Sequence, residues 1–163
     1  MTSTLVLGVG NTLLADEGAG VHAMRFLEKN YDLPDTVFLD GGTLSFTLAD
    51  DIAKATNLLI FDAARMDLAP GCIRVYEGNA FDEFLQSGVK SVHEVGFADL
   101  MDIARLQECL PQNYALIGIQ PEVFGWGDQP GSSVSAALPE AAAQAAALLM
   151  RWTGTTAPEV VNQ

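Results

Sequence analysis

Five short runs of apolar residues along the chain predict five β-strands. Several runs are apolar at consecutive positions, as in Leu-Leu-Ile-Phe at 58–61, so both faces of such a strand would be buried. Burial on both faces is typical of central strands in a sheet that helices cover from both sides. The five runs are Leu5–Val9, Thr36–Leu39, Asn57–Phe61, Cys72–Tyr76 and Tyr114–Ile119.

Helical spacing of apolar residues fills most of the connections between these runs. An alanine-rich stretch from Ser133 to Trp152 predicts a closing helix that Pro139 either kinks or divides. We therefore expect one domain over residues 1–152 and a frayed tail over 153–163. The apolar markers of the earlier helices are Val21, Met24 and Leu27, then Leu48, Ile52 and Ala55, then Phe97, Leu100, Ile103, Ala104 and Leu106.

The connection between the third and fourth runs is too short for a helical crossover. Ten residues separate Phe61 from Cys72, and they include the turn signal Ala69-Pro70-Gly71. A parallel crossover needs about a dozen residues or more, so the fourth strand is expected to be antiparallel to the third or to lie at an edge. The pattern predicts a three-layer α/β domain with a five-stranded, mostly parallel twisted sheet and helices on both faces.

The charge balance narrows the range of partners. The chain has 163 residues with 21 acidic and 8 basic side chains, a formal net charge of −13. Nucleic acid and anionic membranes would be repelled by such a field, whereas a cationic partner, or solubility alone, is compatible with it.

The start of the chain and its cysteines point to a reducing compartment. Met1–Gly8 lacks a basic start, and no apolar run approaches the roughly 18 residues of a membrane span. Cys72 and Cys109 form neither a disulfide framework nor a zinc-ribbon pattern, and we expect both to be packing residues. The expected location is cytoplasmic.

A glycine-rich loop, Gly8 to Gly20, joins the first strand to the first helix and carries Asp16 and Glu17. Glycines there allow a tight turn and close backbone approach. The spacing is not G-x-G-x-x-G, and two carboxylates oppose a pyrophosphate, so nucleotide binding is disfavoured. The two acids could simply favour the helix start through its dipole, or they could serve chemistry.

Two aspartates follow predicted strands. Asp62 comes directly after Phe61, and Asp40 precedes Gly41-Gly42-Thr43 after the second strand. In open α/β sheets the ligand crevice lies at the carboxyl ends of the strands, which favours a role for both aspartates in a site. Each could instead cap a helix or brace a loop.

His93 is the stronger of the two histidines as a candidate. It precedes a predicted helix, whereas His22 is expected to be a partly exposed surface residue of the first helix. Glu17, Asp62 and His93 converging from three connections would make a metal site with open positions. No G-x-S-x-G motif is present, so a protein nucleophile is the less favoured mechanism.

Taken together, these motifs resemble the hydrogenase maturation endopeptidases, which remove the C-terminal extension of the large subunit of [NiFe] hydrogenases. The resemblance runs from about Leu5 to Trp152. It rests on the glycine loop ending in Asp16-Glu17, Asp40-Gly41-Gly42-Thr43, Asp62, Ser91-Val92-His93-Glu94-Val95-Gly96-Phe97 and Ile117-Gly118-Ile119-Gln120-Pro121-Glu122.

The resemblance implies that Glu17, Asp62 and His93 bind metal and that Asp40 is functionally important. It also implies that nickel arrives on the substrate precursor, although the site could accept other divalent cations such as cadmium or zinc. One departure is Gly131-Ser132-Ser133-Val134-Ser135, where relatives often show a Leu-Ser-Pro-type helix start, and it concerns the identity of the substrate. A monomer is expected. The alternatives are a precursor-holding chaperone that does not cut and a small-ligand binding module.

Overall fold

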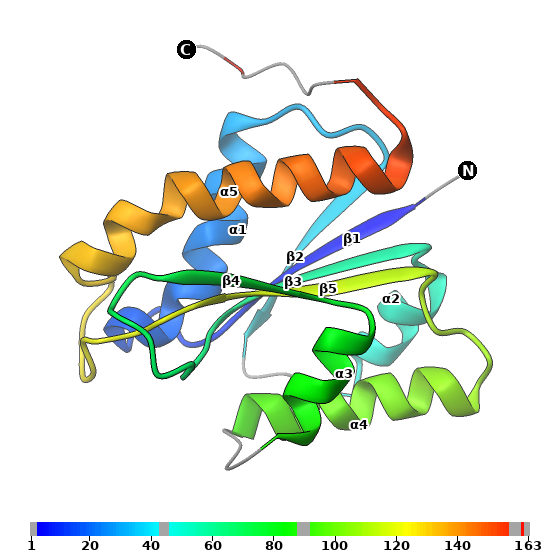
Figure 1. Cartoon of the computed structure of the whole chain (residues 1–163), viewed down its shortest axis with the longest axis horizontal. Coiled ribbons are helices and arrows are strands. Elements are labelled where there is room, and N and C mark those ends of the chain that lie inside the picture. The colour runs from blue at the N-terminus through cyan, green and yellow to red at the C-terminus, as the bar shows by residue number, and fades with distance from the viewer. Residues whose placement is uncertain (1–2, 43–45, 88–91, 157–160, 162–163) are drawn as a thin grey trace.

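A twisted five-stranded sheet lies between two layers of helices in the computed structural model, which describes residues 3–42, 46–87, 92–156 and 161 (Figure 1). The strand order is β2-β1-β3-β5-β4. All neighbours are parallel except β4, which is antiparallel to β5. The predicted fold class and the reversed fourth strand at an edge are confirmed. The strands are β1 Thr4–Val9, β2 Thr36–Gly42, β3 Asn57–Ala63, β4 Ile73–Glu77 and β5 Asn113–Ile119.

Helices α1 (Ala19–Asn30) and α5 (Ser132–Thr153) cover one face of the sheet, and α2, α3 and α4 cover the other (Figure 1). A 3-10 turn, η1 (Ala15–Gly18), leads into α1. Helix α3 (Asn79–Gln86) was not predicted, because eight residues with two buried apolar side chains give too little periodicity. The remaining helices are α2 (Leu48–Lys54) and α4 (Val92–Leu106).

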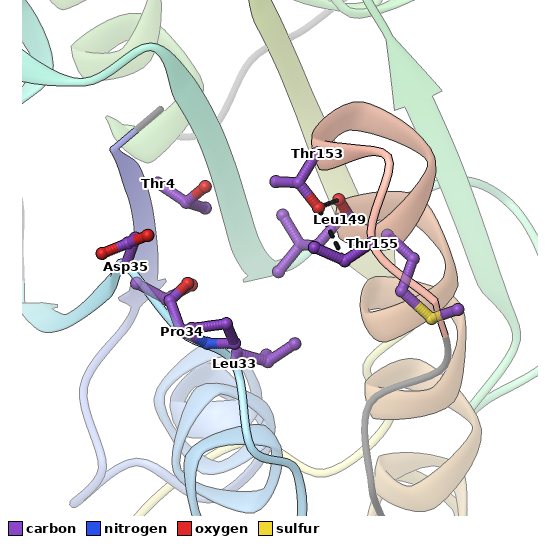
Figure 2. A pocket seen from close by; sticks show the side chains of 9 residues that line it. Thr4, Leu33, Pro34, Asp35, Leu149, Thr153 and Thr155 are labelled. Carbon is purple, nitrogen blue, oxygen red and sulfur yellow. Dashed lines mark hydrogen bonds between the residues drawn. The ribbon is translucent and has the colours of Figure 1, made fainter. Parts of the chain in front are cut away.

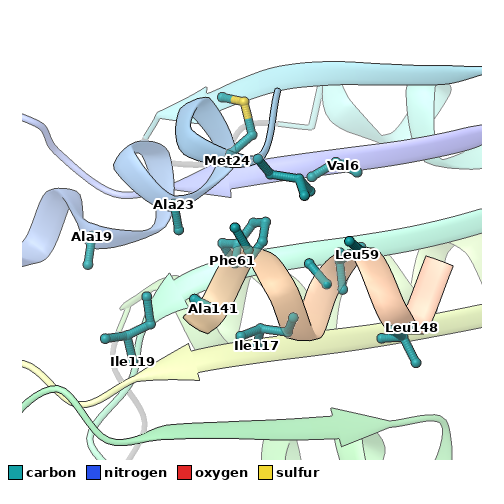
Figure 3. Packing of buried hydrophobic residues seen from close by; sticks show 14 of the residues in the cluster. Val6, Ala19, Ala23, Met24, Leu59, Phe61, Ile117, Ile119, Ala141 and Leu148 are labelled. Carbon is teal, nitrogen blue, oxygen red and sulfur yellow. The ribbon is translucent and has the colours of Figure 1, made fainter. Parts of the chain in front are cut away.

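Residues of β3 alternate between two apolar cores. Leu59 and Phe61 pack with α1 and α5 in the core drawn in Figure 3, whereas Leu58 and Ile60 pack in the core on the side of α2, α3 and α4. Ala63 rejoins the first core. The alternation therefore places the side chain of Asp62 on the α2, α3 and α4 side of the sheet.

Helix α5 has 22 residues, and its composition and length would suit a membrane span. Nevertheless, 44% of its most apolar window is buried inside the protein, against α1 and β5, as a core helix would be. Pro139 lies inside the helix. The helix ends at Thr153, followed by Gly154 in the left-handed conformation, and the Gly154 N–H donates to the Met150 carbonyl.

Buried polar side chains align the amino ends of the central strands. The Asn57 amide on β3 donates to the Thr4 hydroxyl on β1 at 3.2 Å. The Asn113 amide on β5 donates to the Asn57 carbonyl oxygen at 2.9 Å. A shallow pocket of about 80 Å³ also opens at this end, between Thr4, Asp35 and Thr153 (Figure 2). It lies at the edge opposite the predicted site.

Candidate active site at the carboxyl edge of the sheet

Asp40 and Asp62 both lie at the carboxyl edge of the sheet. In the strand register, Gly8 of β1 pairs with Asp40 on β2 and with Phe61 on β3. With strands spaced about 4.8 Å apart, the backbones of Asp40 and Phe61 are therefore about 10 Å apart. Asp62 is the next residue of β3 and is paired with Gly118 of β5.

The surroundings of the two aspartates differ. Asp40 is exposed on the α1 side of the sheet, where the Arg25 guanidinium donates to its Oδ2 at 3.3 Å. The Gly42 N–H donates to Asp40 Oδ1 at 2.9 Å, closing a local turn around the side chain. Asp62 is only 2% exposed and leaves the sheet on the other face. Its carboxylate is thus sheltered by the protein, whereas that of Asp40 is open to solvent.

Glu17 reaches the same edge on η1, which contacts the end of β3. Glycines make this close approach possible. A Cβ on Gly20 would lie 2.2 Å from the Phe61 carbonyl oxygen, and one on Gly10 would lie 1.8 Å from the Glu17 carbonyl oxygen. The close-packed glycines therefore bring η1, with half-buried Glu17, near the carboxyl ends of β1 and β3.

The backbone amides of the glycine loop form hydrogen bonds within the protein. A phosphate site requires several amides that point at the ligand, and here the five successive amides of residues 13–17 already donate to acceptors within the protein. A phosphate could engage these amides only by displacing hydrogen bonds within the protein. The Leu13 N–H donates to Asn11 Oδ1. The other four donate to backbone carbonyls: Leu14 to Asn11, Ala15 to Gly127, Asp16 to Val123, and Glu17 to Leu14.

Asp16 has a role that the sequence did not reveal. Its side chain is buried, with 1% exposure, and its carboxylate accepts three backbone N–H groups from the loop before α5. Glu122 and Val123 donate to Oδ2 at 2.8 and 2.7 Å, and Gly131 donates to Oδ1 at 2.7 Å. Asp16 therefore does more than favour a helix start, because it ties the 122–131 loop to the glycine loop.

Gln120 is a second residue whose role sequence reasoning missed. Its side-chain carbonyl accepts the Met66 N–H at 2.8 Å and the Leu68 N–H at 3.4 Å. The segment that follows β5 thus fixes the segment that follows Asp62. The only signal in the sequence was the position of Gln120 directly after the last strand, within the family-like segment 117–122.

His93 is the second residue of α4, so it begins the helix that it was predicted to precede. Helix α4 lies on the same side of the sheet as Asp62. The side chain of His93 is outside the described part of the structure. Among the side chains that are described, no group of three His, Cys, Asp or Glu residues forms a metal site. The predicted trio of Glu17, Asp62 and His93 stays a prediction.

Of three further expectations, that for Cys72 was wrong, whereas His22, as a partly exposed residue of the first helix, and Cys109, as a packing residue, lie as predicted. His22 is half-buried in α1, and its Nε2 has no hydrogen-bond partner among the described residues. Burial and the nearby Arg25 charge lower the pKa of His22, and Asp128 opposes them. Cys72 is exposed just before β4 and is not a packing residue, whereas Cys109 is half-buried against the α4-side core.

Comparison with known proteins assigns this arrangement to a class. Residues 21–151 match the family model described as hydrogenase maturation protease. The chain is 37% identical over 160 residues to the hydrogenase expression/formation protein HoxM of Cupriavidus necator, covering 97% of this chain and 79% of that protein.

Solved structures agree with the match in sequence. The hydrogenase maturating endopeptidase HybD of Escherichia coli superposes with a TM-score of 0.87 and 32% identity, covering 97% of this chain and 98% of that one. The [NiFe] hydrogenase maturation protease HybD of Thermococcus kodakarensis gives 0.77 and 28%, covering 91% and 99%.

Fold and comparisons together define a peptidase with an α/β architecture. The chain belongs to the hydrogenase maturation protease family. It is a hydrogenase maturation endopeptidase.

Proposed function

We propose that this endopeptidase removes the C-terminal extension of a [NiFe] hydrogenase large-subunit precursor that already carries nickel. The observation that supports the proposal most is the buried carboxylate of Asp62 at the carboxyl edge of β3. The backbone of η1 brings Glu17 near that strand end, and His93 lies in the first turn of α4 on the same side of the sheet.

In this proposal Glu17, Asp62 and His93 complete the coordination of the nickel that the precursor brings. Two carboxylates and an imidazole suit a divalent cation and would also accept cadmium or zinc. The metal would polarise the scissile carbonyl or a water molecule, so that no protein nucleophile is needed. A precursor without nickel could not engage these three side chains, and nickel would thus report that the precursor is ready to be cut.

Asp40 would act on the peptide and not on the metal. Its carboxylate leaves the sheet on the α1 side, beside Arg25, and is open to solvent. From there it could orient the extended chain or assist proton transfer. We further propose that the enzyme is a cytoplasmic monomer and that its partner is the precursor, with neither nucleic acid nor membrane.

The test is to incubate the protein with a candidate precursor, with and without nickel, and to measure the masses of the products. Loss of a C-terminal peptide only in the nickel sample is the expected result. His93→Ala and Asp62→Asn should abolish this loss, while Asp99→Asn on the exposed side of α4 should not change it. Equal cutting of nickel-free precursor would refute the role of the metal.

The same experiment separates the two alternatives. A chaperone would bind the precursor and leave its mass unchanged in every sample. A small-ligand module would neither bind nor cut the precursor and would instead bind a nucleotide in a titration. Nucleotide binding is disfavoured because the amides of residues 13–17 in the glycine loop already donate hydrogen bonds within the protein.

A further inference from the structure

Four exposed apolar side chains lie on two loops that meet at the carboxyl edge of the sheet. Trp126 is 87% exposed, Leu13 57%, Phe124 53% and Val123 42%. They are half of the eight large apolar side chains that are exposed in the described part of the chain, so their grouping is not the usual scatter of single surface residues. We call these four residues the aromatic rim.

The rim is held in place by hydrogen bonds on both sides of its central loop. The Ala15 N–H donates to the Gly127 carbonyl, and the Gly127 N–H donates to the Leu13 carbonyl, each at 2.9 Å. The buried carboxylate of Asp16 binds the amides of Glu122 and Val123. Trp126 therefore projects from a braced loop, and its exposure is a property of the folded state.

The rim is continuous with the candidate active site. Asp16, whose carboxylate holds the rim loop, is the residue before Glu17 in η1. The rim loop is therefore bound directly next to a predicted metal ligand. The Arg65 guanidinium lies 5.5 Å from the centroid of the Phe124 ring, a cation–π contact. Arg65 follows Asp62 by three residues. The rim loops are thus bound to the residue before Glu17 and contact the segment after Asp62, so a polypeptide that reaches these two acids would pass close to the rim.

We propose that the aromatic rim docks an apolar segment of the precursor close to its scissile bond. This inference rests on the proposed function and adds the surface that recognises the substrate. The loop backbone is already ordered, and an aromatic side chain has only two χ angles to fix, so Trp126 and Phe124 suit the anchoring of a partner. Arg65 adds a positive charge beside Phe124 in a protein of net charge −13, so an acidic residue next to the apolar segment fits this surface.

Steady-state kinetics with nickel-loaded precursor test the rim. Replacing the anchors by Trp126→Ala and Phe124→Ala should each raise KM about tenfold and leave kcat at saturation nearly unchanged, since an anchor outside the reacting centre contributes uniform binding. The matched control is Leu106→Ala, because Leu106 is 85% exposed at the far end of α4. Unchanged KM in both rim variants would overturn the inference.

Fluorine NMR reads the same contact without requiring cleavage. With 5-fluorotryptophan the protein gives two resonances, from Trp126 and from Trp152, whose indole N–H is bound to Glu77. Unlabelled precursor should shift or broaden the Trp126 resonance and leave that of Trp152 in place. If precursor is bound but the Trp126 resonance does not move, the rim is not the docking surface.

The two measurements distinguish failure of the docking from failure of the proposed function. Wild-type cleavage with an unmoved Trp126 resonance rejects the rim and keeps the function. A moved Trp126 resonance without any cleavage keeps the rim and rejects the endopeptidase assignment for that precursor. No response in either measurement rejects both for the precursor tested.

Discussion

Asp40 and Asp62 lie near the carboxyl ends of two parallel strands at one edge of the sheet, yet their side chains leave it on opposite faces. Asp40 follows the side-chain alternation of Phe38 toward α1 and binds Arg25, whereas Asp62 follows Ile60 toward α4 and is buried. One β-strand, β1, separates them. The two acids therefore cannot share one environment, and we expect different consequences when each is neutralised.

Asp62→Asn should reduce cleavage of nickel-loaded precursor by about a thousandfold or more, since a group at the reacting centre typically contributes 10²–10⁴-fold. Asp40→Asn should act mainly on KM, with a smaller loss of about tenfold. Initial rates over a range of precursor concentrations measure both. Equal losses in kcat for the two variants would contradict the separation by sheet face.

Asp16→Ala should destabilise the protein by about 3 kcal/mol or more, because three backbone amides lose a charged acceptor in a buried setting. The free energy of unfolding from urea titration gives the value. Ser133→Ala is the control, because its hydroxyl makes one exposed 3.4 Å contact with Glu122 and should cost little. A loss similar to that control would mean that the loop does not depend on Asp16.

Gly20→Ala should lower the free energy of unfolding by about 3 kcal/mol, since overpacking against backbone cannot relax easily. The added Cβ would lie 2.2 Å from the Phe61 carbonyl oxygen and 2.4 Å from that of Val9. Gly41→Ala provides the comparison, because its nearest neighbour at 3.3 Å is a Val9 side-chain methyl group that can move. Thermal and urea unfolding of both variants should therefore separate them clearly.

The pH dependence of stability should include a contribution from Glu77. The guanidinium of Arg151 donates two hydrogen bonds to its carboxylate, and the Trp152 indole donates a third. The hydrogen bonds from Arg151 are the main cause that lowers the pKa of Glu77 in the folded protein, and burial opposes them. This stabilisation is present above the unfolded-state pKa and is lost as the pH falls through the lower folded-state value.

Glu77→Gln should therefore lower Tm by a few degrees at most at neutral pH, because the ion pair is largely open to solvent. The difference from wild type should shrink as the pH falls below the usual range for a glutamate. A difference that grows in acid would contradict the assigned direction of the pKa shift. Asp50→Asn, in the exposed pair with Lys54, is the control and should show a smaller effect.

The features predicted correctly from the sequence are those with a local signature. Asp62 comes directly after four consecutive apolar residues, a pattern that predicts a strand buried on both faces. The position of Asp62 at the carboxyl edge of the sheet could therefore be predicted. The reversed β4 followed from the length of one connection. In contrast, Asp16 binds residues 106 to 115 positions away, and no local pattern encodes that contact.

The aromatic rim escaped prediction for a similar reason. Trp126 and Leu13 are neighbours only because Gly127 pairs with Leu14 across two loops. The sequence shows the loop rich in glycine and aromatic residues, but not which residues are exposed. Helix α3 was missed because its eight residues span barely two turns, so that periodicity had no room to appear.

The side chain of Asn57 bridges Thr4 and Asn113 at the start of three strands. It therefore helps to set the register of β3, including the residues at its carboxyl end. Asp62 lies five positions further along the strand, about 17 Å away. A slip of one residue would move every side chain of β3 to the other face of the sheet, turning Asp62 toward α1 and Phe61 toward α4. These three polar side chains therefore help to fix the strand register. A substitution at the amino edge that shifted β3 would displace Asp62 at the carboxyl edge and abolish activity, although no residue of the site had been changed.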